Sequence, residues 1–425
     1  MFQRPRPRSA RPGGGFRSPA RRRLLAVPLA LAALLWLGAP LRASAPGVPA
    51  PPAPAGSDPA RQEIGRLVQE QQQALDLTRV ERLLAEAERR AGPSAPRLDG
   101  SALRQVLSGG GLPWQPADVA RWLLSSLGRE VVTATGLLLQ LLLLGALAAV
   151  LQQLRVGGGE EVADLAQLAV HLVLFLIAAA QLTLLMQTVR SMVQDVHDWL
   201  LALLPVLMAL LVGTANVATA TLAHPALLFV VTLLADVLDR LVLPLLFLSA
   251  VVGMVGRMGE RFQLTGFAGF LRELAVLALG LIFALFLGVV SVQGIGGAVA
   301  DGAALRAAKF SAKAFIPVVG GMFSDAVELV LTSALLLRNG LGLVGMAGVF
   351  LVAALPILKL VAVSLALRFG QAVIEPWGAG ALPGILGHLA TSAVWFAVAA
   401  GTAALAAILG LGILLGSANL SLLFR

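Results

Sequence analysis

The sequence contains no cysteine, no tyrosine and few charged residues, and each shortage excludes something. Without cysteine, the 425 residues can form no disulfide, no thiolate metal site and no thiol nucleophile. Without tyrosine, the chain lacks one of the two aromatic residues that usually mark a membrane interface. Charged residues make up only 13% of the chain and hydrophobic residues 58%, a balance outside the usual range of soluble domains. The composition therefore predicts an integral membrane protein.

The formal net charge of +9 could indicate a nucleic-acid-binding surface, but all of it lies near the N-terminus. The first 45 residues contain nine arginines and no lysine, aspartate or glutamate, so the rest of the chain is electrically balanced. A nucleic-acid-binding surface needs its basic residues on folded structure. This charge is instead typical of a targeting segment, and we expect no nucleic-acid binding.

Residues 1–45 have the three-part layout of a secretory signal. An arginine-rich region ends at Arg23, an apolar run follows over residues 24–39, and the small residues Ala43-Ser44-Ala45 come next. This layout predicts a signal peptide that is removed, with retention as a membrane anchor as the alternative. Residues 46–60 are rich in proline and alanine, a composition typical of an extended linker.

Residues 61–130 show a helical pattern of apolar residues, interrupted by turn signals around Gly109 and Pro113. We expect a small helical domain here, and the preceding signal peptide would place it outside the cytoplasm. Residues 131–425 are expected to form a multi-spanning membrane domain. The fold class is therefore all-α: a polytopic transmembrane helix bundle with a small N-terminal extracytoplasmic domain.

The membrane domain contains apolar segments of unequal length. A helix needs about 20 apolar residues to cross the hydrocarbon core of a bilayer, and several segments are shorter or are followed at once by charged residues. We expect seven to nine membrane segments, some of them broken or re-entrant. The apolar segments are residues 131–151, 165–189, 200–212, 222–235, 241–255, 274–292, 315–337, 341–367 and 389–415.

Charged residues at membrane depth are costly and therefore indicate functional sites by default. Asp236 and Arg240 are four residues apart, a spacing that lets them neutralise each other on a helix, and Asp239 falls near a helix break at Pro244. For this group the alternatives are structural pairing at a kink, an ion or proton pathway, and contact with a partner.

A second group of charges lies farther along the chain. Asp325 and Glu328 share one face of a helix at a spacing of three, and no basic residue follows within a turn. They are candidates for a pore-lining or cation-facing pair, and the alternative is a helix face packed against another subunit. Lys359 is a possible distant partner for them.

Two further patterns concern helix breaks and membrane interfaces. His224 and Pro225 lie between apolar runs and predict a broken helix, which would form either a packed kink or the wall of a cavity. Arg306, Lys309 and Lys313 have spacings of three and four, which place their charges on one helical face, as in an interfacial helix.

Glycine is abundant at membrane depth, with 45 glycines in the chain. Gly342, Gly345 and Gly348 follow one another at a spacing of three. Small residues let helix backbones approach closely, so this pattern predicts tight packing within the bundle or between subunits.

The sequence shows no catalytic or metal-binding pattern. The histidines are scattered and form no H-E-x-x-H motif or Ser-His-Asp order. We therefore expect no enzyme activity and no cofactor. The four histidines are His171, His197, His224 and His388.

Several distinctive strings lie between about Trp114 and Arg425. They are His224-Pro225, LVLPLLFLSAV from Leu241, GVVSVQG from Gly288, DGAALRAAKF from Asp301, FIPVVGGMFSDA from Phe315, LLLRNGLGLVG from Leu335 and ANLSLLFR from Ala418. These strings resemble the stage III sporulation protein AE family, whose members are large multi-spanning proteins encoded in a sporulation operon of endospore-forming bacteria. The order of signal segment, small outer domain and membrane bundle is also similar.

The resemblance implies a non-enzymatic role in the membrane complex that connects the mother cell with the engulfed forespore. It implies a place in the outer forespore membrane, which derives from the mother cell. The implied partners are the other membrane proteins of the operon, a protein of the forespore membrane and membrane lipid, in an oligomeric assembly. The family provides no catalytic residues to transfer. The alternative function, from a different class, is an autonomous secondary transporter that uses Asp325 and Glu328 in a membrane cavity.

Overall fold

The structure is a computed structural model of the chain, and it describes most residues from Thr78 onward. The expected signal peptide, the linker and the first part of the N-terminal domain lie outside the described residues. Within some helices only the backbone is described, most extensively over residues 307–315, 320–332 and 417–423. The described backbone covers residues 78–97, 100–108, 110–156, 160–214, 216–258, 264–315, 320–378 and 380–423.

All regular elements in the described residues are helices, which confirms the expected all-α class. The longest contain 51 to 55 residues, which at a rise of 1.5 Å per residue corresponds to roughly 80 Å. The elements are α4 (Thr78–Ala91), α5 (Gly100–Leu107), α6 (Pro116–Thr133), α7 (Thr135–Val156), α8 (Glu160–Gly213), α9 (Val217–Val237), the π-helical turn η1 (Leu238–Val242), α10 (Leu243–Met258), α11 (Thr265–Phe315), α12 (Gly320–Ile374), the 3-10 turn η2 (Glu375–Trp377) and α13 (Leu382–Leu423).

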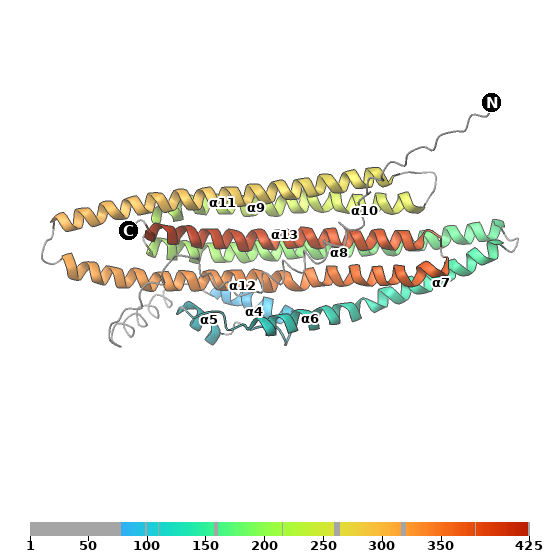
Figure 1. Ribbon diagram of the computed structural model, residues 1–425, viewed down its shortest axis with the longest axis horizontal. Coiled ribbons are helices and arrows are strands. Elements are labelled where there is room, and N and C mark those ends of the chain that lie inside the picture. Colours follow the sequence, from blue (N-terminus) through green and yellow to red (C-terminus); the bar gives the residue numbers. More distant parts are fainter. Residues whose placement is uncertain are drawn as a thin grey trace, which may run out of the picture.

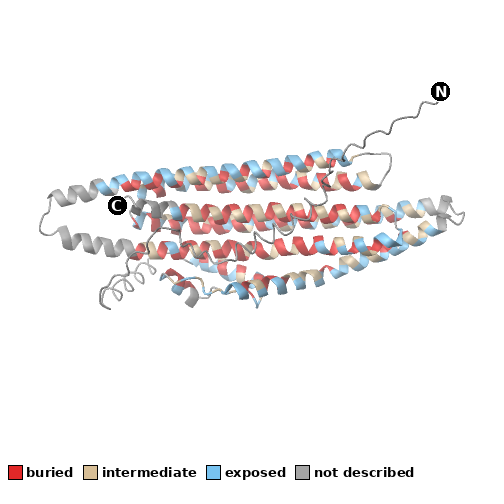
Figure 2. Ribbon diagram, viewed as in Figure 1, coloured by how far each residue is buried: buried red, intermediate tan, exposed pale blue. Residues whose placement is uncertain are grey.

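The long helices lie side by side in an elongated bundle (Figure 1). Helix α11 runs along α9 and α10 at one edge, α8 and α13 form the middle, and α12 packs against both of them. Helices α4 to α7 line the opposite edge along α12. Burial is greatest along α12 and α13, whereas α7 and α11 expose much of their surface (Figure 2).

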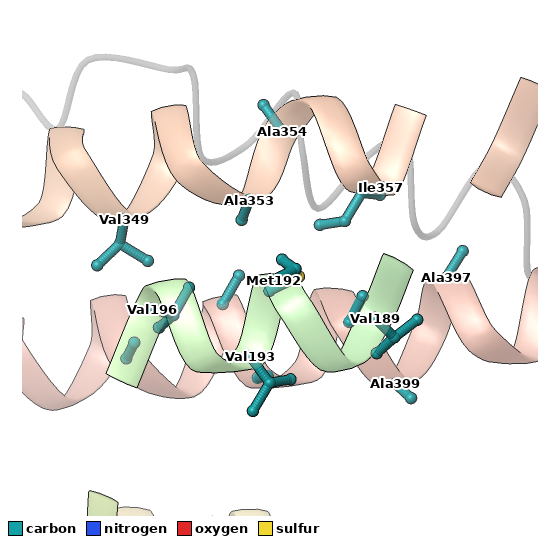
Figure 3. Close-up of a cluster of buried hydrophobic side chains, with 14 of the residues drawn as sticks. Val189, Met192, Val193, Val196, Val349, Ala353, Ala354, Ile357, Ala397 and Ala399 are labelled. Atoms are coloured by element: carbon teal, nitrogen blue, oxygen red, sulfur yellow. The ribbon is translucent and has the colours of Figure 1, made fainter. Parts of the chain in front are cut away.

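The centre of the bundle is an apolar contact between α8, α12 and α13 (Figure 3). Val349, Ala353 and Ile357 of α12 point toward α8, where Val189 and other apolar side chains meet them. Their spacing of four places them on one face of the helix. Small and branched residues alternate here, so the two helices can pack closely along their length.

The glycines of α12 explain how close that packing is. A Cβ atom added to Gly342 would lie 1.9 Å from Leu415 of α13, and one added to Gly348 would lie 1.9 Å from the ring of Trp199 in α8. A Cβ on Gly345 would lie 3.0 Å from Leu203 of α8. The tight packing predicted from this glycine series is therefore confirmed, and it occurs within the bundle.

Five helical stretches in the described residues are long and apolar enough to cross a membrane, which supports a membrane protein; the expected count of seven to nine is not confirmed. Part of the difference arises because neighbouring apolar segments are continuous: residues 165–189 and 200–212 both belong to α8, and residues 320–337 and 341–367 both belong to α12. The rest arises because the segments 222–235 and 241–255, in α9 and α10, are not among the five stretches. The five stretches are Pro116–Gln153, Leu165–Gly213, Thr265–Ala304, Ser333–Trp377 and Leu382–Gly416.

The predicted helix break at His224 and Pro225 is wrong. Both residues lie inside the continuous helix α9, and the chain turns earlier, between Gly213 and Val217. Proline removes one backbone donor and strains a helix interior, but the apolar contacts of α9 with α11 and α8 hold the helix through that point. The small and polar residues before His224, not the proline, mark the turn.

Helices α4, α5 and α6 lie directly against the membrane-type helix α12 (Figure 1). The rings of Trp114 and Trp122 pack on Phe350 of α12, with centroids 6.2 and 6.1 Å away. A Cβ on Gly340 would lie 2.4 Å from the carbonyl oxygen of Val106 in α5. Because of these contacts, α4, α5 and α6 share their hydrophobic core with the bundle. The domain boundary expected at residue 130 falls inside α6.

Candidate functional site: a charged cavity between α4, α8 and α12

A π-helical turn positions the first group of charges. Pro244 has no N–H to donate to the carbonyl of Arg240, so the regular helical hydrogen bonding is interrupted here. The N–H of Leu243 donates to the carbonyl of Leu238, five residues back, which is the hydrogen bond of a π-helix. The wider turn directs Asp239 toward α8, where its carboxylate pairs with the guanidinium of Arg190. Such single π turns often occur at functional sites.

The spacing-based pairing of Asp236 with Arg240 is present in the structure. Their charged atoms lie 3.4 Å apart, but the side chains are 53% and 78% exposed. An exposed pair of this kind contributes little to stability. Asp239 was expected near a helix break, and it lies instead in the π turn, with Arg190 of a different helix as its partner. Arg190 was not singled out from sequence because the two residues are far apart along the chain.

A cavity of about 520 Å³ opens near this level of the bundle, where α4 covers the groove between α8 and α12. Its apolar lining includes Leu83 and Ala87 from α4 and Leu351, Val352 and Leu355 from α12. Thr188 and Ser191 of α8 also line it. Its size falls within the range of small-molecule sites.

Six charged side chains line the cavity: Glu86 and Arg90 of α4, Glu130 of α6, Asp195 and Asp198 of α8, and Lys359 of α12. Arg90 connects α4 to α8, because its guanidinium lies 2.6 Å from the Asp195 carboxylate and 3.0 Å from the Glu86 carboxylate. The nearby negative charge of Asp195 is the main cause that raises the pKa of Arg90. This network holds α4 over the cavity.

The other three charged residues of the cavity, Lys359, Glu130 and Asp198, make fewer polar contacts. No ion pair or hydrogen bond joins Lys359 or Glu130 to another group in the described part of the chain. Asp198 is 63% exposed and has the ring of His197 3.6 Å away. The cavity thus offers one available cation and two available carboxylates. Among the candidate membrane charges whose side chains the structure describes, Lys359 is the one that lines this cavity.

The remaining sequence candidates are not brought together. Asp325 and Glu328 lie in α12, but their side chains are outside what the structure describes. Arg306, Lys309 and Lys313 lie in the last turns of α11, which continues without a break from the stretch Thr265–Ala304. They therefore belong to the end of a long helix, and the basic face at a membrane interface stays a prediction.

Sequence reasoning missed a second polar site at the turn between α8 and α9. The carboxylate of Asp301, only 4% exposed, accepts hydrogen bonds from the backbone N–H groups of Ala218 and Thr219 at 2.7 and 2.9 Å. It also accepts a hydrogen bond of 2.6 Å from the Thr219 hydroxyl. A negative charge is favourable at a helix N-terminus, so Asp301 of α11 caps α9 from outside.

The other side of the same turn faces a buried arginine. Arg338 of α12 is fully buried and donates a hydrogen bond of 3.5 Å to the hydroxyl of Thr214, just beyond the end of α8. A positive charge is favourable at a helix C-terminus. The turn is thus flanked by two buried charges of suitable sign. In the sequence, the features that could have indicated this site are an acidic residue, Asp301, and a basic residue, Arg338, that each lie between apolar segments.

The described residues contain no group of three or more His, Cys, Asp or Glu that could bind a metal ion. What the site offers is a partly apolar cavity with ionic groups at its wall, features suited to binding a ligand of matching charge.

Comparison with known proteins identifies the family. A family profile described as stage III sporulation protein AE matches residues 99–418. The chain is 32% identical over 313 residues to the stage III sporulation protein AE of Bacillus subtilis (strain 168), covering 73% of this chain and 78% of that protein. No solved structure shows a significant match. The match covers α5 to α13 almost completely, and the chain therefore belongs to the stage III sporulation protein AE family.

Proposed function

We propose that the protein is a membrane component of the channel complex that links the mother cell to the engulfed forespore and sustains forespore development. The family match across residues 99–418 is the observation that carries this proposal. In it, the protein resides in the outer forespore membrane and assembles with the other membrane proteins of its operon and with a partner in the forespore membrane. Its role is non-enzymatic.

The structure adds physical support for a role in an assembly. The centre of the bundle is filled by side chains where α8, α12 and α13 meet, at glycines that leave no spare room. Exposed leucines and valines are numerous on α7, α8 and α11, and such surface must be covered by lipid or by other proteins. These features are compatible with a subunit that packs against other membrane proteins in a larger complex.

An autonomous transporter remains the alternative, through Asp325 and Glu328. The two proposals differ in what the isolated protein does. A transporter should move a solute across liposomes that contain this protein alone, and Asp325→Asn should reduce the flux. A channel component should show no such flux without its partners.

The decisive experiment is genetic. Deletion of the gene in its host should arrest sporulation after engulfment, and the wild-type gene at a second locus should restore heat-resistant spores. Normal spore yield in the deletion strain would refute a required role. Arrest before engulfment would place the protein at a different step from the one proposed.

A further inference from the structure

We propose that the cavity between α4, α8 and α12 binds a small organic cation, an aliphatic amine with an apolar chain. This inference is independent of the channel role and rests on the charge, shape and lining of the cavity. A site of this size requires a chemical match at both its polar and its apolar walls.

The balance of charge favours a cation. Four carboxylates and two cations line the cavity, an excess of two negative charges. Arg90 is already engaged by Asp195 and Glu86, so it cannot balance a further carboxylate. Lys359 alone remains against Glu130 and Asp198. A positively charged ligand therefore lowers the electrostatic energy of the site, whereas an anion raises it.

The shape of the cavity favours an elongated ligand. Its lining extends along α8 from Thr188 to Asp198 and along α12 from Leu351 to Lys359. These stretches correspond to about 15 and 12 Å at a rise of 1.5 Å per residue. Leu83, Leu351, Val352 and Leu355 supply apolar surface along this path. A chain of methylene groups can cover that surface, whereas a hydrated inorganic ion cannot.

A backbone carbonyl of α12 provides a further hydrogen-bond acceptor in the cavity, beside the carboxylates. Pro356 has no N–H, so the carbonyl of Val352 does not receive the usual hydrogen bond from four residues ahead. Both residues line the cavity. An ammonium group has three N–H donors and no acceptor, and this cavity supplies carboxylate and carbonyl acceptors along its length.

Spermidine is a suitable probe, since it carries ammonium groups on a methylene chain. The full-length protein, purified in detergent, is titrated with spermidine by calorimetry at low salt. We expect saturable binding that weakens as salt is added. Glu130→Gln should weaken it about tenfold, because a hydrogen bond to a charged group contributes that much. Asp198→Asn should weaken it a few-fold, because the Asp198 side chain is 63% exposed and solvent screens its charge. No saturable binding to the wild-type protein overturns the proposal.

Two further variants control the interpretation. Asp236→Asn removes the same charge from an exposed position outside the cavity, and it should leave binding unchanged. Lys359→Gln removes the competing cation, so it should strengthen spermidine binding several-fold. If Asp236→Asn weakens binding as much as Asp198→Asn does, the effect is non-specific and the proposal fails. If Lys359→Gln weakens binding, the site recognises a different class of ligand. Asp198 is largely exposed, so its variant should fold normally.

Discussion

The contact between Gly348 and Trp199 gives the sharpest prediction about the bundle. An alanine at position 348 would place its Cβ 1.9 Å from Cζ2 and 2.2 Å from Cε2 of the Trp199 ring, where carbon atoms normally stay at least about 3.5 Å apart. The ring cannot easily move, because Trp199 is only 1% exposed and its indole N–H donates a hydrogen bond of 2.9 Å to the carbonyl of Gly345. Gly348→Ala should therefore destabilise the contact between α8 and α12.

The expected magnitude follows from the terms that change. Overpacking a filled core costs about 1 to 3 kcal/mol, and a buried indole that loses its acceptor costs about the same again. Replacing glycine by alanine in a helix returns roughly 0.5 to 1 kcal/mol. The net loss is about 3 kcal/mol. With an unfolding entropy of about 2.1 cal/mol/K per residue, this lowers the midpoint of thermal unfolding by roughly 3 °C.

The assay is thermal unfolding of the purified protein in detergent, followed by the loss of the monodisperse peak in size-exclusion chromatography. Gly401→Ala is the matched control, since a Cβ there would meet nothing within 4 Å, and its midpoint should stay equal or rise. In the Trp199→Phe background the cost of Gly348→Ala should shrink, because the smaller ring leaves room. Equal midpoints for Gly348→Ala and Gly401→Ala would refute the predicted contact.

Two further predictions concern charges. Asp239→Asn should destabilise the protein by about 1 kcal/mol, because it removes the partner of Arg190 on another helix. Asp236→Asn should cost less than about 0.5 kcal/mol, because Asp236 belongs to an exposed ion pair. Equal midpoints of thermal unfolding for the two variants would contradict this ranking. Asp301→Asn should cost about 1 to 2 kcal/mol by weakening the cap of α9, and hydrogen exchange at the amide of Thr219 should speed up; unchanged exchange there would disprove the cap.

Local patterns in the sequence were sufficient for the fold class and for part of the packing. Long apolar segments dictate helices, and the spacing of Gly342, Gly345 and Gly348 indicated a face that a neighbour could approach closely. The i, i+4 spacing of Asp236 and Arg240 also placed their side chains correctly. These features depend on the periodicity of a single helix, which sequence shows directly.

Features that depend on two distant segments could not be found in this way. Residues 165–189 and 200–212 read as two spans, because the sequence cannot show that a polar stretch between them remains helical. The expectation for Pro225 failed for a similar reason: packing against neighbouring helices offset the local cost of a proline. The partners of Arg190 and Asp301 lie far along the chain, and only the folded bundle brings them together.

Charged residues of α4, α8 and η1 form ion pairs over a short stretch of α8, and this constrains how a membrane can surround the bundle. Arg190 pairs with Asp239, while Arg90 pairs with Asp195 of the same helix α8. A single charge at the centre of a bilayer costs at least about 2.5 kcal/mol, so four exposed charges at one depth would cost about 10 kcal/mol, as much as the whole stability margin of a typical protein.

Helices of roughly 80 Å are also more than twice as long as the hydrocarbon core, which is about 30 Å thick. A large part of each long helix must therefore lie outside the hydrocarbon, wherever the bundle sits. The least costly placement keeps the charged level in the water-accessible part. The cavity at that level can then be reached from water, as the binding of a small, soluble amine requires.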